Sequence, residues 1–316
     1  MTLNIGIAIP EDHVTQKCSM FGVTGTGKSN GIGVMLEEYC KRKLPFVCID
    51  VLGAHYGLAE KYRVVIYGGK KGEELETFNG RFMANVIFGG DEHKLSFIFD
   101  LSEWNDFEMQ EWMAEFLDEI FMLHSKNRVP RHIFVEEAEV FFPQNGYDSS
   151  KASLLAGNKV MKRGRALGLG MTLISQRPQD VNKKTLSQSQ CNFLLHLEGV
   201  PEMKVVREML RSEEKEKRDE LLKIVTNAKK GECLLYSPQW MGEPIPFKFR
   251  LRETFHAGYT PELGVEIKEP ELSYQIKPKL VEESNESNTT DQPLSNGKIV
   301  IGISLGVILY WLTSIT

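Results

Sequence analysis

Residues 22–29, GVTGTGKS, have the composition and spacing of a phosphate-binding loop. They match G-x-x-x-x-G-K-S at every fixed position, between an apolar run at 18–21 and a helical pattern. Glycines let backbone N–H groups converge on phosphate oxygens, and the helix N-terminus adds partial positive charge. We expect Lys28 to contact the β- and γ-phosphates of a nucleotide and Ser29 to ligate Mg²⁺. The residues expected to bind the nucleotide are Gly22, Thr24, Gly25, Thr26, Gly27, Lys28 and Ser29.

Two acidic residues, Glu136 and Glu137, directly follow the apolar run 131–135, and this pattern resembles a Walker B motif. By position Glu136 is expected to hold the Mg²⁺ shell, a role more often taken by Asp. Glu137 is expected to orient and deprotonate the attacking water as a general base. Glu is one methylene longer than Asp, which leaves the division of labour between the two acids open. The alternative interpretation is a strand that ends in solvated acids.

Gln176 and two arginines complete the set of candidate catalytic residues. Gln176 follows the apolar run 170–174, and strand ends line the ligand crevice of a parallel sheet, so it is placed to sense the γ-phosphate or the lytic water. Arg163 and Arg165 end the preceding helical pattern. Cations are favoured at any helix C-terminus, but these two also suit an arginine finger that enters a neighbouring subunit's site.

The elements that must position these residues are short apolar runs alternating with helical patterns. The runs are continuous, as in strands buried on both faces of a parallel sheet. They cover residues 18–21, 46–49, 64–67, 96–99, 132–135, 170–174, 193–197 and 233–236. Helical patterns at 28–43, 106–125 and 151–167 imply βαβ units with right-handed crossovers. The sequence therefore predicts an α/β fold with a mostly parallel central sheet flanked by helices.

Charge and cysteine usage exclude some classes of protein. The 316 residues have a formal net charge of -5, so the chain is not a broadly basic nucleic-acid binder. Residues 151–190, however, hold eight Lys or Arg and one acid, which fits either a solvated face or a surface for a polyanion. The five cysteines include no CxxC pair, so we expect neither a disulfide framework nor a zinc site, and a reducing compartment fits best.

Taken in order, these motifs resemble the HerA/FtsK branch of RecA-like motor ATPases, and most closely the HerA-like ATP-binding proteins. The resemblance covers roughly residues 3–262. The run 162–188, with its RGR, SQRP and LSQ elements, is its most specific part. The other matching segments are 22–29, 49–58, 99–102, 134–144 and 252–261.

This resemblance implies a RecA-like P-loop NTPase fold, ATP and Mg²⁺ as cofactors, and a hexameric ring that moves double-stranded DNA through its pore. By matching position, Arg165 is the best counterpart of the family's trans-acting arginine, and Arg163 is the second. The residues that would serve the subunit's own nucleotide are Lys28, Ser29, Glu136, Glu137 and Gln176. The chain departs from the family in having Glu136 as the first Walker B acid and in its apolar tail.

The chain divides into an ATPase domain at 1–262, a solvated linker at 263–298 and an apolar tail at 299–316. A charged helical insertion is expected at about 201–231. As a helix the tail would span about 27 Å, close to the ~30 Å of a bilayer core. It is expected to be either a membrane anchor or a buried or partner-binding helix. An anchor would leave the ATPase domain on the cytoplasmic face, and the expected location is cytoplasmic.

The function expected from these features is that of an ATP-driven DNA translocase of the helicase, packaging or segregation type. Two alternatives remain open on sequence alone. One is a membrane-associated ATPase that acts on a protein partner in secretion or conjugation. The other is a nucleotide-switched scaffold or defence component.

Overall fold

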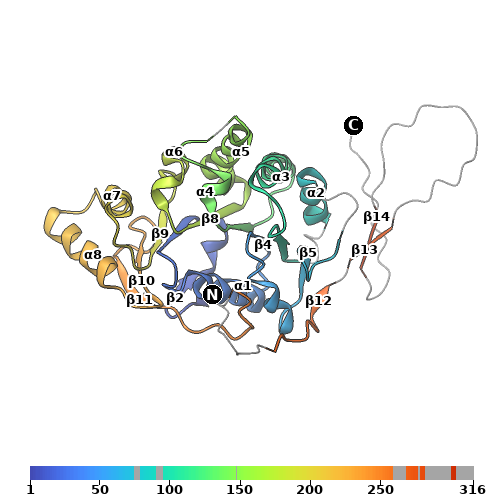
Figure 1. Ribbon diagram of the computed structural model, residues 1–316, viewed down its shortest axis with the longest axis horizontal. Helices are drawn as coiled ribbons and strands as arrows, with labels where there is room; N and C mark the ends of the chain where they lie inside the picture. Colours follow the sequence, from blue (N-terminus) through green and yellow to red (C-terminus); the bar gives the residue numbers. More distant parts are fainter. Residues whose placement is uncertain are drawn as a thin grey trace, which may run out of the picture.

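A computed structural model of the chain shows one central sheet with helices packed on both of its faces (Figure 1). The structure describes residues 1–74, 79–89, 95–146, 148–258, 268–276, 278–281 and 300–303.

The central sheet has ten strands in the order β11-β10-β9-β3-β8-β7-β4-β6-β5-β12. From β9 to β12 every neighbouring pair is parallel, whereas β10 and β11 add an antiparallel edge. The strands are β3 (Lys17–Phe21), β4 (Phe46–Asp50), β5 (Val64–Gly68), β6 (Phe97–Asp100), β7 (Arg131–Val135), β8 (Leu169–Ser175), β9 (Cys191–Leu194), β10 (Glu232–Tyr236), β11 (Ile245–Lys248) and β12 (Gln275–Ile276). This architecture confirms the predicted α/β fold with a mostly parallel sheet.

The continuous apolar runs became strands because both faces of the sheet are covered. All five residues of β4 and of β7 are buried. In β7, Ile133 and Val135 belong to the hydrophobic core on one face, and Phe134 belongs to the core on the other. Side chains alternate across a strand, so a strand buried on both faces has to be apolar at nearly every position.

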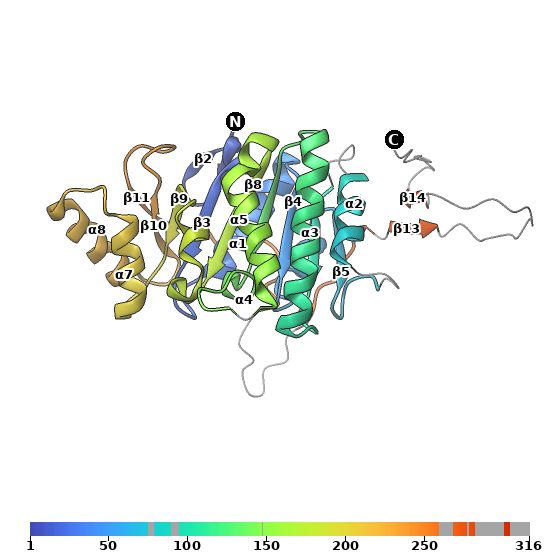
Figure 2. The same cartoon turned by 90° about the horizontal axis from the view of Figure 1, so that it is seen from above.

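One face of the sheet is covered by α2 (Gly80–Gly89), α3 (Asp106–Lys126) and α5 (Ser150–Arg163), which lie side by side (Figure 2). The shorter helices α4 (Ala138–Phe141) and α6 (Lys183–Leu186) connect to this layer. In α3 an Asn105–Glu108 capping box satisfies the first-turn N–H groups. Its residues Trp112, Phe116 and Ile120 repeat every four positions and therefore share the buried face.

The opposite face is covered by α1 (Lys28–Arg42) and by the N-terminal strands β1 (Thr2–Asn4) and β2 (Ala8–Pro10). The fully buried Glu37 of α1 holds the segment after β11 against this helix. Its carboxylate accepts hydrogen bonds from the backbone N–H groups of Glu253 and Thr254 and pairs with Arg250 at 2.7 Å.

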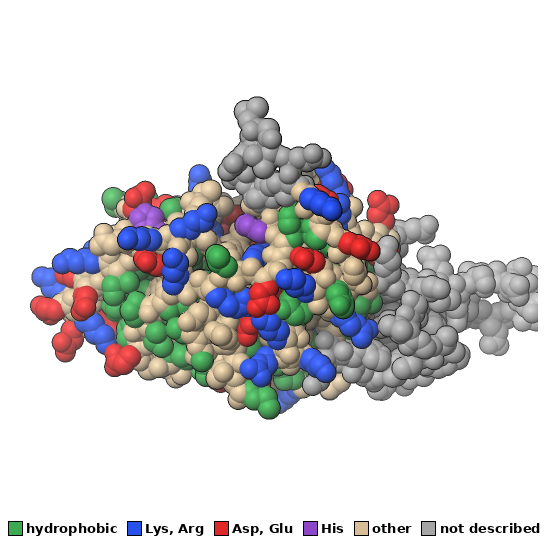
Figure 3. Space-filling view, turned by 90° about the horizontal axis from the view of Figure 1, so that it is seen from below, with side chains coloured by type: hydrophobic (Ala, Val, Ile, Leu, Met, Phe, Trp, Pro, Cys, Tyr) green, Lys and Arg blue, Asp and Glu red, His purple; other side chains and the backbone are tan. Residues whose placement is uncertain are grey.

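Two helices lie between β9 and β10 in the chain, and the second of them packs against β10. They fall in the segment at about 201–231 where a charged helical insertion was expected. They are α7 (Val200–Met209) and α8 (Lys215–Asn227). Val206 and Leu222 pack into the core, whereas most of the charged residues face solvent. Over the described part of the lower face of the molecule, basic and acidic side chains are interspersed (Figure 3).

Part of the expected linker packs against the sheet, which differs from the prediction of a solvated segment. Residues Gln275–Ile276 form β12 parallel to β5, and Ile276 is buried. Tyr274 N–H donates to Ala59 O, and Lys71 pairs with Glu269. Without β12, strand β5 would be an edge strand with unpaired backbone N–H and C=O groups. The segment pairs with β5, and its apolar residues Leu272 and Ile276 pack against the hydrophobic cores.

The apolar tail lies mostly outside the described residues. Its described part, Val300–Ile303, forms strand β14, which pairs with β13 (Pro278–Val281) and is not helical. Within the ranges that the structure describes, no helix has the length and the apolar composition needed to cross a membrane.

The Glu37 contacts predict a large loss of stability when its charge is removed. Glu37→Gln should lower the free energy of unfolding by about 3 kcal/mol, because Arg250 loses one of its buried partners and two backbone N–H groups lose a charged acceptor. Urea unfolding followed by circular dichroism measures this change. The control is Asp118→Asn, which removes an exposed ion pair with Lys159 and should change stability by less than about 1 kcal/mol. Equal effects of the two substitutions would contradict the prediction.

Candidate functional site

The loop 22–29 joins the end of β3 to the start of α1 at the carboxyl edge of the parallel sheet. Gly25 and Gly27 have φ values of 82° and 104°, in the left-handed region where glycine has no steric cost. A Cβ on Gly25 would meet no atom within 4 Å, so this part of the loop is open. Thr26 Oγ1 donates to Val23 O and fixes the turn.

Lys28 folds back over this loop. Its buried ammonium donates to Gly22 O and, at 3.2 Å, to Val23 O. Burial lowers the pKa of Lys28 to about 8, against the attraction of Glu137, Glu139 and Glu136. The ammonium is thus held by loop carbonyls that a phosphate group can replace as its partner. Ser29, the next residue, is half-buried in the first turn of α1.

A chain of hydrogen bonds connects the loop to the second acidic residue. Thr24 Oγ1 donates to Gln176 Oε1, and Gln176 Nε2 donates to Glu137 Oε1 at 2.7 Å. These three residues come from the loop after β3, the end of β8 and the end of β7, which are adjacent strands. The structure therefore brings together three of the residues predicted from sequence.

Glu137 has an unusual backbone conformation. Its φ of 43° and ψ of 54° lie in the left-handed region, which costs a residue other than glycine roughly 1–2 kcal/mol. The conformation ends β7 sharply and starts α4 at the next residue. Strain of this kind persists only where surrounding contacts hold it, and here the hydrogen bond from Gln176 is one of them.

Glu136 is buried and points to a different partner. Its Oε1 lies 2.9 Å from His55 Nε2, whereas its Oε2 is buried without a hydrogen-bond partner in the described part of the chain. A buried carboxylate oxygen without a partner, close to Lys28 and to further carboxylates, has the donor chemistry of a Mg²⁺ ligand or of a hydrogen-bonded water in its shell. Glu136 therefore has the donor chemistry that its predicted metal role needs, and the metal role of Ser29 stays a prediction.

The sequence interpretation missed two residues beside Glu136. Asp50 ends β4, the strand next to β7, and accepts hydrogen bonds from His55 N at 2.9 Å and Leu52 N at 3.1 Å. Ligand atoms of Asp50, His55 and Glu136 all lie within 4.8 Å of one another, and all three residues are buried. The available signal was an acid at the end of the apolar run 46–49, the same signal that identified Glu136.

The charges of this buried group depend on one another. Burial, together with Glu136, raises the pKa of Asp50 to about 6. Burial alone would lower the pKa of His55, but the carboxylates of Glu136 and Asp50 raise it overall. Two residues beyond Glu137, burial and the neighbouring Glu137 charge raise the pKa of Glu139 to about 7. The site thus holds two acids, Asp50 and Glu139, whose protonation changes near neutral pH.

Arg252, from the segment after β11, is a third residue that the sequence interpretation did not identify as part of the site. A Cβ on Gly33 of α1 would lie 2.8 Å from the Arg252 guanidinium carbon, so the glycine makes room for this side chain. Burial lowers the pKa of Arg252, while Glu37, Asp50 and Glu136 attract its charge. The available signal was the match of segment 252–261 to the HerA-like pattern.

The structure does not bring Arg163 and Arg165 into this site. Arg163 ends α5, and Arg165 lies in the short helix η4 (Gly164–Leu167) that precedes β8, whereas Gln176 follows β8. The seven residues of β8 span about 20 Å, so the two arginines lie at the opposite edge of the sheet. Both are exposed.

The environment of Lys28 predicts a dependence of nucleotide affinity on pH. The ammonium form binds phosphate, and in the free protein this form is lost as the pH rises through about 8. The Kd of a non-hydrolysable ATP analogue should therefore rise above pH 8, by up to about tenfold for each pH unit. Isothermal titration calorimetry between pH 7 and 9.5 measures the slope. Lys28→Arg, which does not titrate in this range, should bind more weakly but with a flat profile. A flat profile in the unsubstituted protein would refute the prediction.

Comparison with known proteins places this geometry in a family. A 106-residue segment is 32% identical to "Probable DNA double-strand break repair helicase HerA" of Methanocaldococcus jannaschii, covering 34% of this chain and 20% of that protein. A 208-residue segment is 29% identical to "Probable helicase MJECL08" of the same organism, covering 65% of this chain and 34% of that protein. The chain thus spans about a third or less of the length of these relatives.

Solved structures share the fold at low sequence identity. The genome packaging NTPase B204 from Sulfolobus turreted icosahedral virus 2, in complex with AMPPCP, matches with a TM-score of 0.50 and 15% identity, over 74% of this chain and 98% of that one. VirB4 of Thermoanaerobacter pseudethanolicus matches with a TM-score of 0.55 and 13% identity, over 80% of this chain and 95% of that one.

The family model for "Helicase HerA, central domain" matches residues 3–191, from the N-terminal strands through the phosphate-binding loop, the paired acids and Gln176. The chain belongs to the family of the HerA helicase central domain, and it is an ATPase with the fold of a P-loop NTPase.

Proposed function

We propose that the chain hydrolyses ATP and uses this reaction to translocate double-stranded DNA, as one subunit of a ring. The observation that carries the hydrolytic part is the line of hydrogen bonds from Thr24 through Gln176 to Glu137. It joins the phosphate-binding loop to the general base, as a hydrolytic site requires.

The loop binds the triphosphate through its backbone N–H groups and through Lys28, which exchanges the carbonyls of Gly22 and Val23 for phosphate oxygens. Ser29 and Glu136 would hold Mg²⁺, which when bound neutralises charge on the β- and γ-phosphates. His55 fixes Glu136 through one carboxylate oxygen and leaves the other free for this role.

Glu137 activates the attacking water in this proposal. Its left-handed backbone turns the side chain out of the line of β7, and Gln176 holds one of its oxygens. Gln176 also contacts Thr24, so a nucleotide that moves Thr24 changes the position of the base. The positions of both acids support the order predicted from sequence, with Glu136 at the metal and Glu137 at the water.

Arg165, with Arg163 as the second candidate, acts in a neighbouring subunit. Both guanidinium groups are exposed at the amino edge of the sheet, about the length of β8 away from their own loop. A ring that packs this edge against the loop of the next subunit would supply a cation to the developing charge on the phosphates. This arrangement supports a ring, and we propose six subunits from the resemblance to the family.

Exposed cations on α5, η4 and α6 support DNA as the substrate. Their side chains make no ion pair within the described residues, and α5 contacts both η4 and α6. These cations are Lys162, Arg163, Arg165, Lys183 and Lys184. Unpaired exposed cations bind phosphates at low cost, because no internal partner has to be given up.

The division of the chain into domains stays a prediction. We propose an ATPase domain at 1–262, which is cytoplasmic, followed by the segment 263–298. A membrane tether at 299–316 is a further part of this proposal and concerns residues that lie mostly outside those described.

Mixing two inactive variants tests whether the arginine acts between subunits. Glu137→Gln should bind ATP but lose at least about a hundredfold in turnover, because the water has no base. Arg165→Ala should lose a similar factor, because the neighbouring site lacks its cation. In mixed rings some interfaces combine an intact Glu137 with an intact Arg165, so ATPase activity should recover in part.

The control for the base is Glu111→Gln, which removes an exposed acid on α3 and should leave turnover unchanged. Arg163→Ala in the same mixing experiment shows which arginine acts. Mixtures no more active than either variant alone, in rings verified by analytical ultracentrifugation, would rule out action between subunits.

DNA dependence is tested through the cations of α6. Double-stranded DNA should stimulate the ATPase rate, and Lys183→Glu/Lys184→Glu should abolish most of this stimulation while the basal rate is kept, because the phosphates then meet like charge. The matched control is Lys215→Glu/Lys223→Glu, two exposed lysines of α8. The translocase proposal fails if assembled rings at low salt show no stimulation by any DNA.

A further inference from the structure

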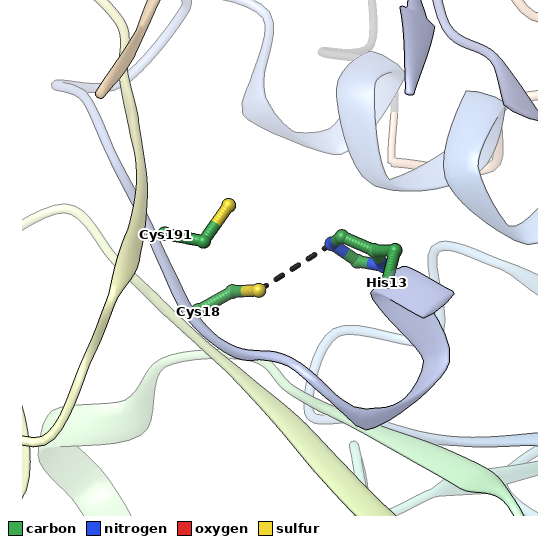
Figure 4. Close-up of side chains that lie close together, drawn as sticks. All are labelled: His13, Cys18 and Cys191. Carbon is green, nitrogen blue, oxygen red and sulfur yellow. Dashed lines mark hydrogen bonds between the residues drawn. The ribbon is translucent and has the colours of Figure 1, made fainter. Parts of the chain in front are cut away.

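A buried group of one histidine and two cysteines lies at the edge of the sheet opposite the nucleotide site. We name His13, Cys18 and Cys191 the His13 cluster. His13 comes from the short helix η1 (Glu11–Thr15), Cys18 from the start of β3 and Cys191 from the start of β9. All three side chains are fully buried. Figure 4 shows Cys18 Sγ directed at the His13 ring, with Cys191 beside it.

The three ligand atoms are as close together as those of a metal site. Cys18 Sγ lies 3.4 Å from His13 Nε2, and the three atoms lie within 4.8 Å of one another. Around Zn²⁺, with Zn–S near 2.3 Å and Zn–N near 2.0 Å, tetrahedral geometry places S and N roughly 3.5 Å apart and two sulfurs roughly 3.8 Å apart. The distance between Cys18 Sγ and His13 Nε2 is therefore that of two ligands of one ion.

The strand pairing holds the two thiols in place. Cys18 and Cys191 are direct partners in the parallel register of β3 and β9, so their side chains leave the sheet on the same face. The histidine approaches from the turn that leads into β3. Residues far apart in sequence therefore converge from three elements on one point.

The histidine also has the outer partner typical of a metal ligand. His13 Nδ1 lies 2.7 Å from the hydroxyl of Tyr39, which is buried in α1. If Nδ1 carries the proton and donates to this hydroxyl, Nε2 presents its lone pair to the two sulfurs. Hydrogen bonds of this kind orient ligating histidines and fix their tautomer. The stacked ring of His132, at 4.9 Å between ring centroids, restricts the imidazole further.

The donor atoms of the cluster are two cysteine sulfurs and one imidazole nitrogen. Thiolates and imidazole are the ligands that zinc and copper(I) prefer, and carboxylates are absent from the cluster.

We propose that the His13 cluster binds one thiophilic metal ion of the Zn²⁺ or Cu⁺ type through His13 Nε2, Cys18 Sγ and Cys191 Sγ. The ion ties η1 to β3 and β9 at the strand ends remote from the loop 22–29. Its role is structural, because all three ligands are fully buried and lie at the end of the sheet away from the nucleotide. The proposal is independent of DNA translocation.

Cobalt(II) titration of the metal-free, reduced full-length protein tests whether the cluster binds an ion of the Zn²⁺ type. One equivalent of Co²⁺ should produce the near-ultraviolet charge-transfer absorption of thiolate–cobalt bonds, and Zn²⁺ should displace it. For Cu⁺, competition with a chromogenic copper(I) chelator should show one tightly bound equivalent. Binding of either ion should raise the melting temperature.

Substitutions locate the site. Cys18→Ser and Cys191→Ser should each lose the cobalt charge-transfer signal or reduce it by half, and Tyr39→Phe should weaken binding by about 10–100-fold with the signal intact. The matched control is Cys48→Ser, a buried cysteine of β4 outside the cluster, which should titrate like the unsubstituted protein.

The titration of the unsubstituted protein decides the matter even if a variant fails to fold. Absence of one-equivalent binding for both Co²⁺ and Cu⁺ would overturn the proposal. A signal of undiminished intensity in both Cys18→Ser and Cys191→Ser, or a Cys18–Cys191 disulfide in the freshly purified protein, would overturn it equally.

Discussion

The parallel register of β3, β8, β7 and β4 is the constraint on which the rest of the structure depends. Parallel strands place all their carboxyl ends at one edge, so the loop after β3, Gln176 after β8, the acids after β7 and Asp50 at the end of β4 meet there. No single motif creates this site. It arises because four short apolar runs are buried on both faces and therefore pair side by side.

Burial of charge at this edge sets the chemistry of the side chains. Lys28 is surrounded by carboxylates yet has a lowered pKa, because the loss of water outweighs their attraction. The same balance raises the pKa of Asp50 and Glu139. The pKa values of these groups lie closer to neutrality than usual, and a triphosphate beside Lys28 and a cation beside the acids would favour the charged forms. A site with this property is suited to binding a charged ligand more than to stabilising the fold.

The carboxyl ends and the amino ends of the strands carry different functional groups. The carboxyl edge holds the nucleotide residues, whereas the amino edge holds the exposed arginines and the His13 cluster. Because β3 and β8 cross the whole sheet, they connect both edges rigidly. An arginine fixed at the start of β8 is therefore well placed for an adjacent subunit and out of reach of its own loop. The segment after β11 places Arg252 against Gly33 of α1, where Asp50 and Glu136 attract its charge.

The sequence by itself determined the α/β fold, the phosphate-binding loop, the acids at 136–137 and Gln176, because each depends on local patterns of glycine, apolar runs and strand ends. Only the tertiary structure decided that Glu136 pairs with His55, that Glu137 pairs with Gln176 and that Arg252 joins the site. It also placed part of the expected linker on the sheet edge and brought Cys18 next to Cys191. The reason is physical: contacts between residues from 39 positions apart, as for Glu137 and Gln176, to more than a hundred apart, as for Cys18 and Cys191, follow from strand order, which no local pattern contains.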